Sequence, residues 1–139
     1  MSDREFLDTN VLVYAFDVAD RRKHEIAQAL TVRALAGESA ISAQVLSELS
    51  AILLQKYRAT YDARAVLAIL DSLRPIPLIV PDAAMVRRAV EAYAAYGIHF
   101  YDGMIVAAAE RGRCGEIFSE DLNAGQEYFG VRVVNPFVA

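Results

Sequence analysis

Short apolar stretches with strand character alternate with longer helix-like stretches along the whole chain, and this alternation constrains the fold more than any other feature. It favours a three-layer α/β/α sandwich built on a mostly parallel sheet. The length of 139 residues fits one domain, so residues 1–139 are expected to form a single domain. Five strands are expected, over 4–7, 40–42, 76–80, 116–119 and 131–134, and helices over 11–16, 21–35, 43–56, 62–73, 82–96 and 101–111.

Composition excludes several classes of protein. Cys114 is the single cysteine, which rules out an internal disulfide and a cysteine-based zinc site. Residues 1–5 are polar, and Asp8 and Asn10 interrupt the apolar run that follows, so no signal peptide is expected. No run approaches the ~20 uncharged apolar residues that a membrane helix needs. We therefore expect a cytoplasmic protein with no membrane partner.

Charge and hydropathy leave two questions open. The net charge of −4, from 14 basic and 18 acidic residues, argues against a non-specific nucleic-acid binder with a basic face. It does not exclude an enzyme that binds nucleic acid through metal ions. The apolar fraction of 55% exceeds the ~45–50% of ordinary soluble domains. This surplus predicts either a partner or self-association surface, or simply an alanine-rich helical protein.

Four acidic residues occupy positions that suit a functional site, and each also has an ordinary explanation. Asp8 follows the first expected strand and Asp121 the fourth, while Asp102 opens the helix that ends at residue 111. Glu48 lies three and four residues from Val45 and Ile52, which places it on the apolar face of its helix, where a buried carboxylate is costly. The ordinary explanations are helix caps for Asp8 and Asp102, a solvent-facing position for Glu48 and a polar turn at Asp121.

On a parallel sheet these positions converge. Ligands of such sheets bind outside the carboxyl ends of the strands, at the point where the strand order reverses. If the first and fourth strands are neighbours, Asp8 and Asp121 face one crevice, with Asp102 and Glu48 reaching in from helices. Several carboxylates with almost no histidine suit hard cations such as Mg²⁺ or Mn²⁺.

The same residues resemble a known family. The four motifs, in order, are Asp8-Thr9-Asn10, Ser47-Glu48-Leu49, Tyr101-Asp102-Gly103 and Ser119-Glu120-Asp121. They resemble the motifs of PIN domains, most closely those of VapC-type toxins from bacterial and archaeal toxin–antitoxin pairs. The resemblance implies a sheet order of 3-2-1-4-5. Pro77 supports it independently, because proline within the third strand points to a sheet edge.

The resemblance also implies an activity and partners. It implies an endoribonuclease that uses Mg²⁺ or Mn²⁺ and leaves a 5′-phosphate and a 3′-hydroxyl, and a cognate antitoxin that inhibits it. The apolar surplus and the family together predict a homodimer. An apolar groove for the antitoxin is expected on the helices 43–56 and 62–73.

Roles follow for the individual side chains. Asp8 and Asp102 are expected as main metal ligands, with Asp121 and Glu48 completing the catalytic site directly or through water. Thr9, Asn10 and Ser119 are expected to orient the ligands. Four arginines, Arg87, Arg88, Arg111 and Arg113, are candidates for phosphate contacts, although a solvated face is their ordinary role.

Two other classes of function compete with a nuclease. An acid after the first strand also suits aspartyl-phosphate chemistry, as in phosphatases. Such sites need a lysine near the phosphoryl group, but the only lysines are Lys23 and Lys56, and neither lies at the end of a later strand. In addition, Asn10 stands where the phosphatase motif has a second acid. The other alternative is a non-catalytic protein-interaction module whose acids are all caps, which predicts no cation binding. No glycine-rich loop follows a strand, which excludes dinucleotide and P-loop sites.

Overall fold

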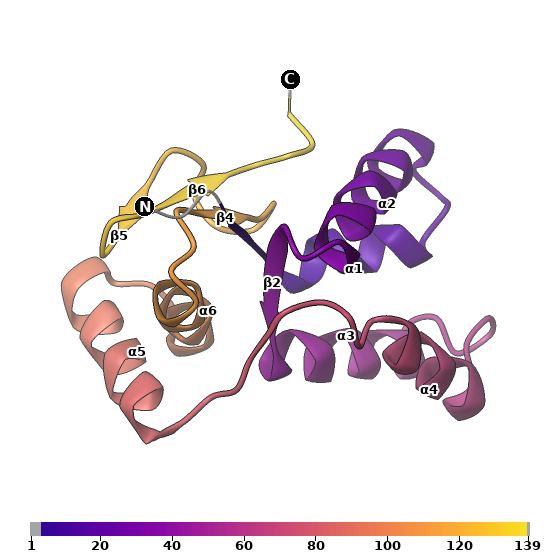
Figure 1. Ribbon diagram of the computed structural model, residues 1–139, viewed down its shortest axis with the longest axis horizontal. Coiled ribbons are helices and arrows are strands. Elements are labelled where there is room, and N and C mark those ends of the chain that lie inside the picture. Colours follow the sequence, from indigo (N-terminus) through magenta and orange to yellow (C-terminus); the bar gives the residue numbers. More distant parts are fainter. Residues whose placement is uncertain (1–3, 139) are drawn as a thin grey trace.

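The computed structural model describes residues 4–138, and a twisted sheet runs through them with helices on its two sides (Figure 1). The strand order is β3-β2-β1-β4-β6-β5. All neighbouring strands pair in parallel except β5 and β6, which are antiparallel. The strands are β1 (Glu5–Leu7), β2 (Ser39–Ser42), β3 (Leu78–Ile79), β4 (Glu116–Phe118), β5 (Glu127–Tyr128) and β6 (Val131–Val134).

The predicted sandwich and its mostly parallel sheet are confirmed, but the sheet has six strands rather than five. The additional strand, β5, contains only Glu127 and Tyr128, too few residues to show an alternating pattern. Phe129 and Gly130 join it to β6 and both have positive φ angles, of 50° and 82°, as in a tight hairpin turn. Without β5 the order is the expected one, and β3, which begins after Pro77, lies at the edge.

Within residues 4–138, six helices cover the sheet, and each overlaps the stretch predicted for it. α5 and α6 pack together on one side of the molecule and α1 packs with α2 on the other (Figure 1). Most of them begin at a polar side chain that accepts from a backbone N–H of the first turn. The helices are α1 (Thr9–Phe16), α2 (Arg21–Leu35), α3 (Ala43–Gln55), α4 (Ala63–Ser72), α5 (Ala83–Tyr96) and α6 (Phe100–Arg111).

The helix α6 is the most deeply buried, because residues 103–109 are all buried. Its small side chains let α5 approach closely. A Cβ atom at Gly103 would lie 2.8 Å from the backbone oxygen of Ala89, so glycine is required at this crossing. The close contact fixes the first turn of α6, which carries Asp102.

Among residues 4–138, none of the helices has the length and apolar character needed to cross a membrane. Residues 1–3, part of the polar segment that argued against a signal peptide, lie outside the described residues.

Candidate active site

The candidate site lies where the strand order reverses. β1 pairs with β2 on one side and with β4 on the other, and Leu7 is the register partner of Phe118. The backbone N–H of Asp8 donates to the carbonyl of Phe118 at 3.0 Å, which continues the pairing one residue beyond the strands. The carboxyl ends of β1 and β4 therefore lie together, and the segments that follow them share one crevice.

Asp8 is held tightly at the bottom of this crevice. Its side chain is 7% exposed and caps α1, because Oδ1 accepts from the backbone N–H of Thr9 at 2.7 Å. Its other oxygen, Oδ2, accepts from the Ser119 hydroxyl at 2.8 Å and more weakly from the Asn10 amide at 3.4 Å. Asp8 therefore caps α1, as its ordinary explanation requires, and its carboxylate is also fixed at the point where the strand order reverses.

Asn10 and Ser119 organise the segment after β4. Asn10 Nδ2 donates to Asp121 Oδ2 at 3.2 Å and to Ser119 Oγ at 3.3 Å, while Asn10 Oδ1 accepts from the backbone N–H of Glu120 at 2.9 Å. Ser119 Oγ also accepts from the backbone N–H groups of Asp121 and Leu122, each at 3.2 Å. These two side chains thus link the end of β1 to the end of β4 and orient two of the four acids.

Glu48 and Asp102 differ from the prediction in detail. Glu48 is exposed rather than buried on the apolar face of α3, because that edge of the helix borders an open cavity. Its Oε1 accepts from the Thr9 hydroxyl at 3.0 Å and from Gln44 Nε2 at 3.3 Å. Asp102 is not a helix cap: His99 caps α6, and Asp102 lies in its first turn, half-buried.

All four acids line one cavity of about 400 Å³. Tyr14, Asp17, Gln44, Tyr101 and Glu120 also contribute to its wall, as do the apolar side chains of Val13, Ile52 and Ile105. The structure therefore brings together the acidic residues that the sequence placed at four separate points of the chain.

The carboxylates of the cavity repel one another. The pKa of Asp8 is raised to about 6, mainly by burial and also by the negative charges of Glu48 and Asp121, while hydrogen bonds from Ser119 and Thr9 oppose the rise. Burial also raises the pKa of Asp102, with the charge of Asp121 acting in the same direction and His99 opposing it. A cation in the cavity would favour the ionised form of both groups.

The donor set fits a hard divalent cation. Every acidic ligand offers oxygen, and the buried Asp8 carboxylate faces like charges that a cation would offset. Among residues 4–138, however, no three acidic or histidine side chains are arranged to hold an ion together as they stand. Glu48 and Asp121 are exposed, so their side chains have room to turn toward Asp8.

Several contributors to the cavity could not be found from sequence motifs, and the expected arginines do not reach it. None of the four candidate arginines lines the cavity. Arg88 instead pairs with Glu110, and Arg111 pairs with Asp82. The cation on the cavity wall is Lys56, which has Asp17 nearby.

Solved structures of toxin–antitoxin proteins are among those that resemble the chain in fold. A toxin–antitoxin complex from Klebsiella pneumoniae matches with 21% identity over 95% of this chain and 97% of that chain, with a TM-score of 0.69. VapC20 of Mycobacterium tuberculosis, described as a sarcin-ricin loop cleaving toxin, matches with 20% identity over 84% and 91%, with a TM-score of 0.65. VapBC2 from Rickettsia felis, bound to a promoter DNA fragment, matches with 19% identity over 94% and 96%, also with a TM-score of 0.65.

No curated protein matches the chain in sequence. The identities to the solved structures are low, so these likenesses establish the fold alone. The family model described as PIN domain, in contrast, matches the sequence itself over residues 6–126. That range runs from β1 to the residue before β5 and includes all four acids of the cavity. The chain therefore belongs to the PIN domain family.

Proposed function

We propose that this protein is a toxin-type endoribonuclease that hydrolyses RNA phosphodiester bonds with Mg²⁺ or Mn²⁺ held by Asp8, Glu48, Asp102 and Asp121. One observation carries the proposal: in a chain of the PIN family, these four acids line a single cavity at the switch point of the sheet. The likeness to toxin structures, VapC20 and VapBC2 among them, supports the toxin assignment.

The four acids are assigned different roles according to their positions in the cavity. Asp8 and Asp102 are the main metal ligands, and Asp121 and Glu48 complete the set directly or through water. When bound, the cation supplies an activated water and stabilises negative charge on the leaving oxygen. One carboxylate of the cluster accepts the proton that the attacking water loses.

Neighbouring side chains keep these ligands in place. The Ser119 hydroxyl and the Thr9 backbone hold both oxygens of Asp8, the Thr9 hydroxyl holds Glu48, and Asn10 holds Asp121. Such partners of metal ligands fix their orientation and raise metal affinity.

The wall of the cavity also suits an anionic substrate once the cation is present. Lys56 is the only lysine or arginine among the lining residues of the described chain, and it stands beside Tyr57 at the end of α3. We assign Lys56 to a phosphate of the bound RNA next to the cleaved bond. Its ammonium group would offset the negative charge of that phosphate, while the metal ion acts on the phosphate that is cleaved.

The proposal includes a cognate antitoxin, a homodimer and a cytoplasmic location. Of the apolar side chains on α3 and α4, where the antitoxin groove is expected, that of Leu53 is buried in the core. Leu54 and Leu67 are 42% and 62% exposed, which leaves apolar surface for a partner helix. A basic side chain from that partner would pair with Asp8 or Asp102 and compete with the cation.

The proposal is tested by incubating the purified chain with a mixed RNA pool in millimolar Mn²⁺ or Mg²⁺. We expect cleavage to fragments with 5′-phosphates, and complete loss of cleavage in EDTA. We also expect the isolated chain to be a dimer by light scattering. Co-expression with a small protein encoded in the adjacent reading frame, the expected antitoxin, should give a complex with suppressed cleavage.

The outcomes separate the parts of the proposal. A folded chain that cleaves no RNA with either cation would refute the nuclease and favour a non-catalytic interaction module. A monomer whose cleavage is unaffected by the neighbouring protein would refute the partner assignments and leave the nuclease standing.

A further inference from the structure

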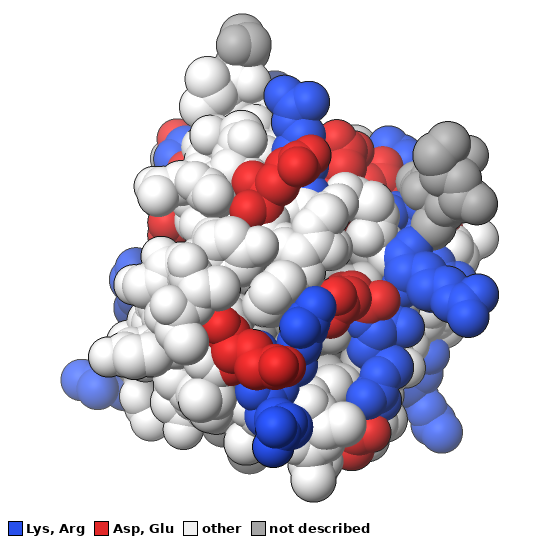
Figure 2. Space-filling model, turned by 90° about the vertical axis from the view of Figure 1, so that its left-hand side faces the viewer, with Lys and Arg blue, Asp and Glu red and all other residues white. Residues whose placement is uncertain are grey.

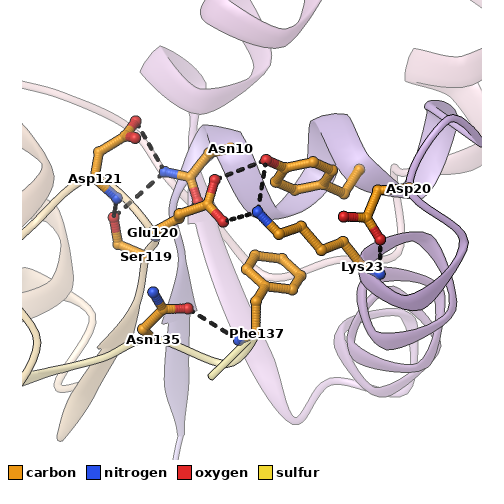
Figure 3. A network of polar contacts seen from close by, with 9 residues as sticks. Asn10, Asp20, Lys23, Ser119, Glu120, Asp121, Asn135 and Phe137 are labelled. Carbon is orange, nitrogen blue, oxygen red and sulfur yellow. Dashed lines mark hydrogen bonds and ion pairs between the residues drawn. The ribbon is translucent and has the colours of Figure 1, made fainter. Parts of the chain in front are cut away.

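Glu120, which separates Ser119 from Asp121, has no place in the proposed metal site but is the centre of a second polar network. Its carboxylate contacts one side chain of α1 and one of α2, and Figure 3 shows it beside Lys23. Oε1 accepts from the Tyr14 hydroxyl at 2.7 Å, and Oε2 accepts from Lys23 Nζ in an ion pair. The segment after β4 is thereby attached to two helices from the other end of the sequence.

The network closes on itself. Lys23 Nζ also donates to the Tyr14 hydroxyl at 3.3 Å and lies 5.0 Å from the centre of the Tyr14 ring. The Tyr14 ring meets the buried Phe137 ring edge-on at 5.0 Å, and Lys23 Nζ is 5.8 Å from the Phe137 ring (Figure 3). Cation and aromatic contacts of this kind restrict the position of the ammonium group.

The other side of Glu120 leads to the cavity. Its backbone N–H donates to Asn10 Oδ1, and the same Asn10 side chain donates to Asp121 Oδ2 (Figure 3). Asp121 itself is exposed, so the packing around it does little to fix its carboxylate. Its position depends on the Asn10 hydrogen bond and on the backbone of residues 119–121, which is anchored by Ser119 on one side and by the Glu120 side chain on the other.

We propose that Lys23 and Tyr14, acting through Glu120, are positioning residues that hold Asp121 at the acidic cavity. This inference rests on the proposed function for its consequence, because Asp121 is one of the proposed ligands. An anchored Glu120 carboxylate restricts the dihedral angles of the peptide it shares with Asp121, and less freedom is then lost when Asp121 binds a cation. Lys23 also offsets the charge of Glu120, which lines the same cavity as the four acids.

If the ion pair between Lys23 and Glu120 had only a structural role, its loss would change the stability of the protein little. The side chains of Lys23 and Glu120 are 27% and 26% exposed, and ion pairs of this type contribute modestly to stability. A positioning role predicts instead that loss of the ion pair loosens residues 119–121 and weakens cation binding, with the rest of the fold unchanged.

The test compares Lys23→Met with Lys23→Arg and with a control, Arg21→Met. Arg21 stands on the same helix and forms an ion pair with Glu25, but both side chains are largely exposed, at 90% and 61%. Two readouts are used: amide hydrogen exchange at Glu120, Asp121 and Leu122 in EDTA, and the Mn²⁺ concentration that gives half of the maximal rise in melting temperature.

We expect Lys23→Met to accelerate exchange at these amides about tenfold or more, because local opening there becomes easier. It should raise the half-effective Mn²⁺ concentration about 3–10-fold, less than the 10–100-fold typical for direct partners of metal ligands. Lys23→Arg should restore most of both values, and Arg21→Met should match the wild type. Glu120→Gln, which retains an acceptor for Tyr14 but loses the charge, serves as a second variant if Lys23→Met fails to fold.

Unchanged exchange and unchanged Mn²⁺ response in both Lys23→Met and Glu120→Gln would overturn the inference. If the wild type shows no response to Mn²⁺ while exchange still accelerates in the variants, the positioning of Asp121 stands and the proposed metal site fails. If the wild type responds to Mn²⁺ and the variants respond equally, with unchanged exchange, the metal site stands and the positioning role fails.

Discussion

Replacing Asp8 with asparagine is expected to lower metal-dependent RNA cleavage about a thousandfold while the protein remains folded. The substitution removes the charge of the most buried acid of the cavity, and the lost transition-state stabilisation of several kcal/mol corresponds to a factor of this size. Cleavage of a mixed RNA pool in Mn²⁺ measures the effect, and circular dichroism checks the fold.

Asp71→Asn is a suitable control, because Asp71 is exposed on α4 and does not line the cavity. It should cleave RNA at the wild-type rate. Near-normal cleavage by a folded Asp8→Asn variant would show that Asp8 is not a ligand of the catalytic metal ion.

The stability of the protein in EDTA is expected to carry a pH-dependent penalty from Asp8. The pKa of this group is about 6 in the folded protein and 3.8 in an unperturbed chain. Well below pH 3.8 the carboxyl is protonated in both states and has no effect on stability. As the pH rises from about 4 to 6 the unfolded state loses its proton first, so stability falls, by up to about 3 kcal/mol, and then levels off.

Urea unfolding of the wild type and of Asp8→Asn between pH 4 and 8 isolates this contribution, because the other carboxyl groups are common to both proteins. The free energy of unfolding of the wild type should fall relative to the variant as the pH rises from 4 to about 6, and the difference should then stay constant up to pH 8. Millimolar Mn²⁺ should reverse the loss in the wild type, since a ligand of the folded state alone raises stability by mass action. A difference between the two proteins that stays constant with pH would contradict the raised pKa of Asp8.

The sequence predicts those parts of the molecule that depend on local pattern. The strand before Asp8, the helix at 21–35 and the edge position of the strand after Pro77 all follow from periodicity and from the chemistry of proline, and the structure confirms them. The gathering of the four acids at one cavity followed from the rule that places ligands at the carboxyl ends of parallel strands.

Features that depend on tertiary packing could not be predicted in this way. The spacing of Val45 and Ile52 indicates the buried face of α3, but whether the edge next to it meets another element or a cavity depends on the whole fold, and Glu48 meets a cavity. The first turn of α6 begins at His99, whose imidazole accepts from the backbone N–H of Tyr101, so that Asp102 lies inside the helix.

Contacts between side chains far apart in the sequence could not be predicted either. Lys23 and Glu120 are separated by 97 residues, and their ion pair exists because α2 packs beside α1 and so reaches the end of β4. The only local signal was the position of Glu120 next to Asp121, which a turn explains equally well. Lys56 reaches the cavity from the end of α3, where no motif marks it.

Locating manganese by its anomalous scattering in crystals grown with millimolar Mn²⁺ shows directly whether the four acids form a divalent cation site. We expect a manganese peak inside the acidic cavity, with a carboxylate oxygen of Asp8 among its ligands and at least one further ligand from Asp102, Asp121 or Glu48. The same crystals of Asp8→Asn should show that peak weakened or lost. A fully liganded manganese elsewhere with none in the cavity, or an empty cavity at saturating Mn²⁺, would show that the four acids do not form a cation site.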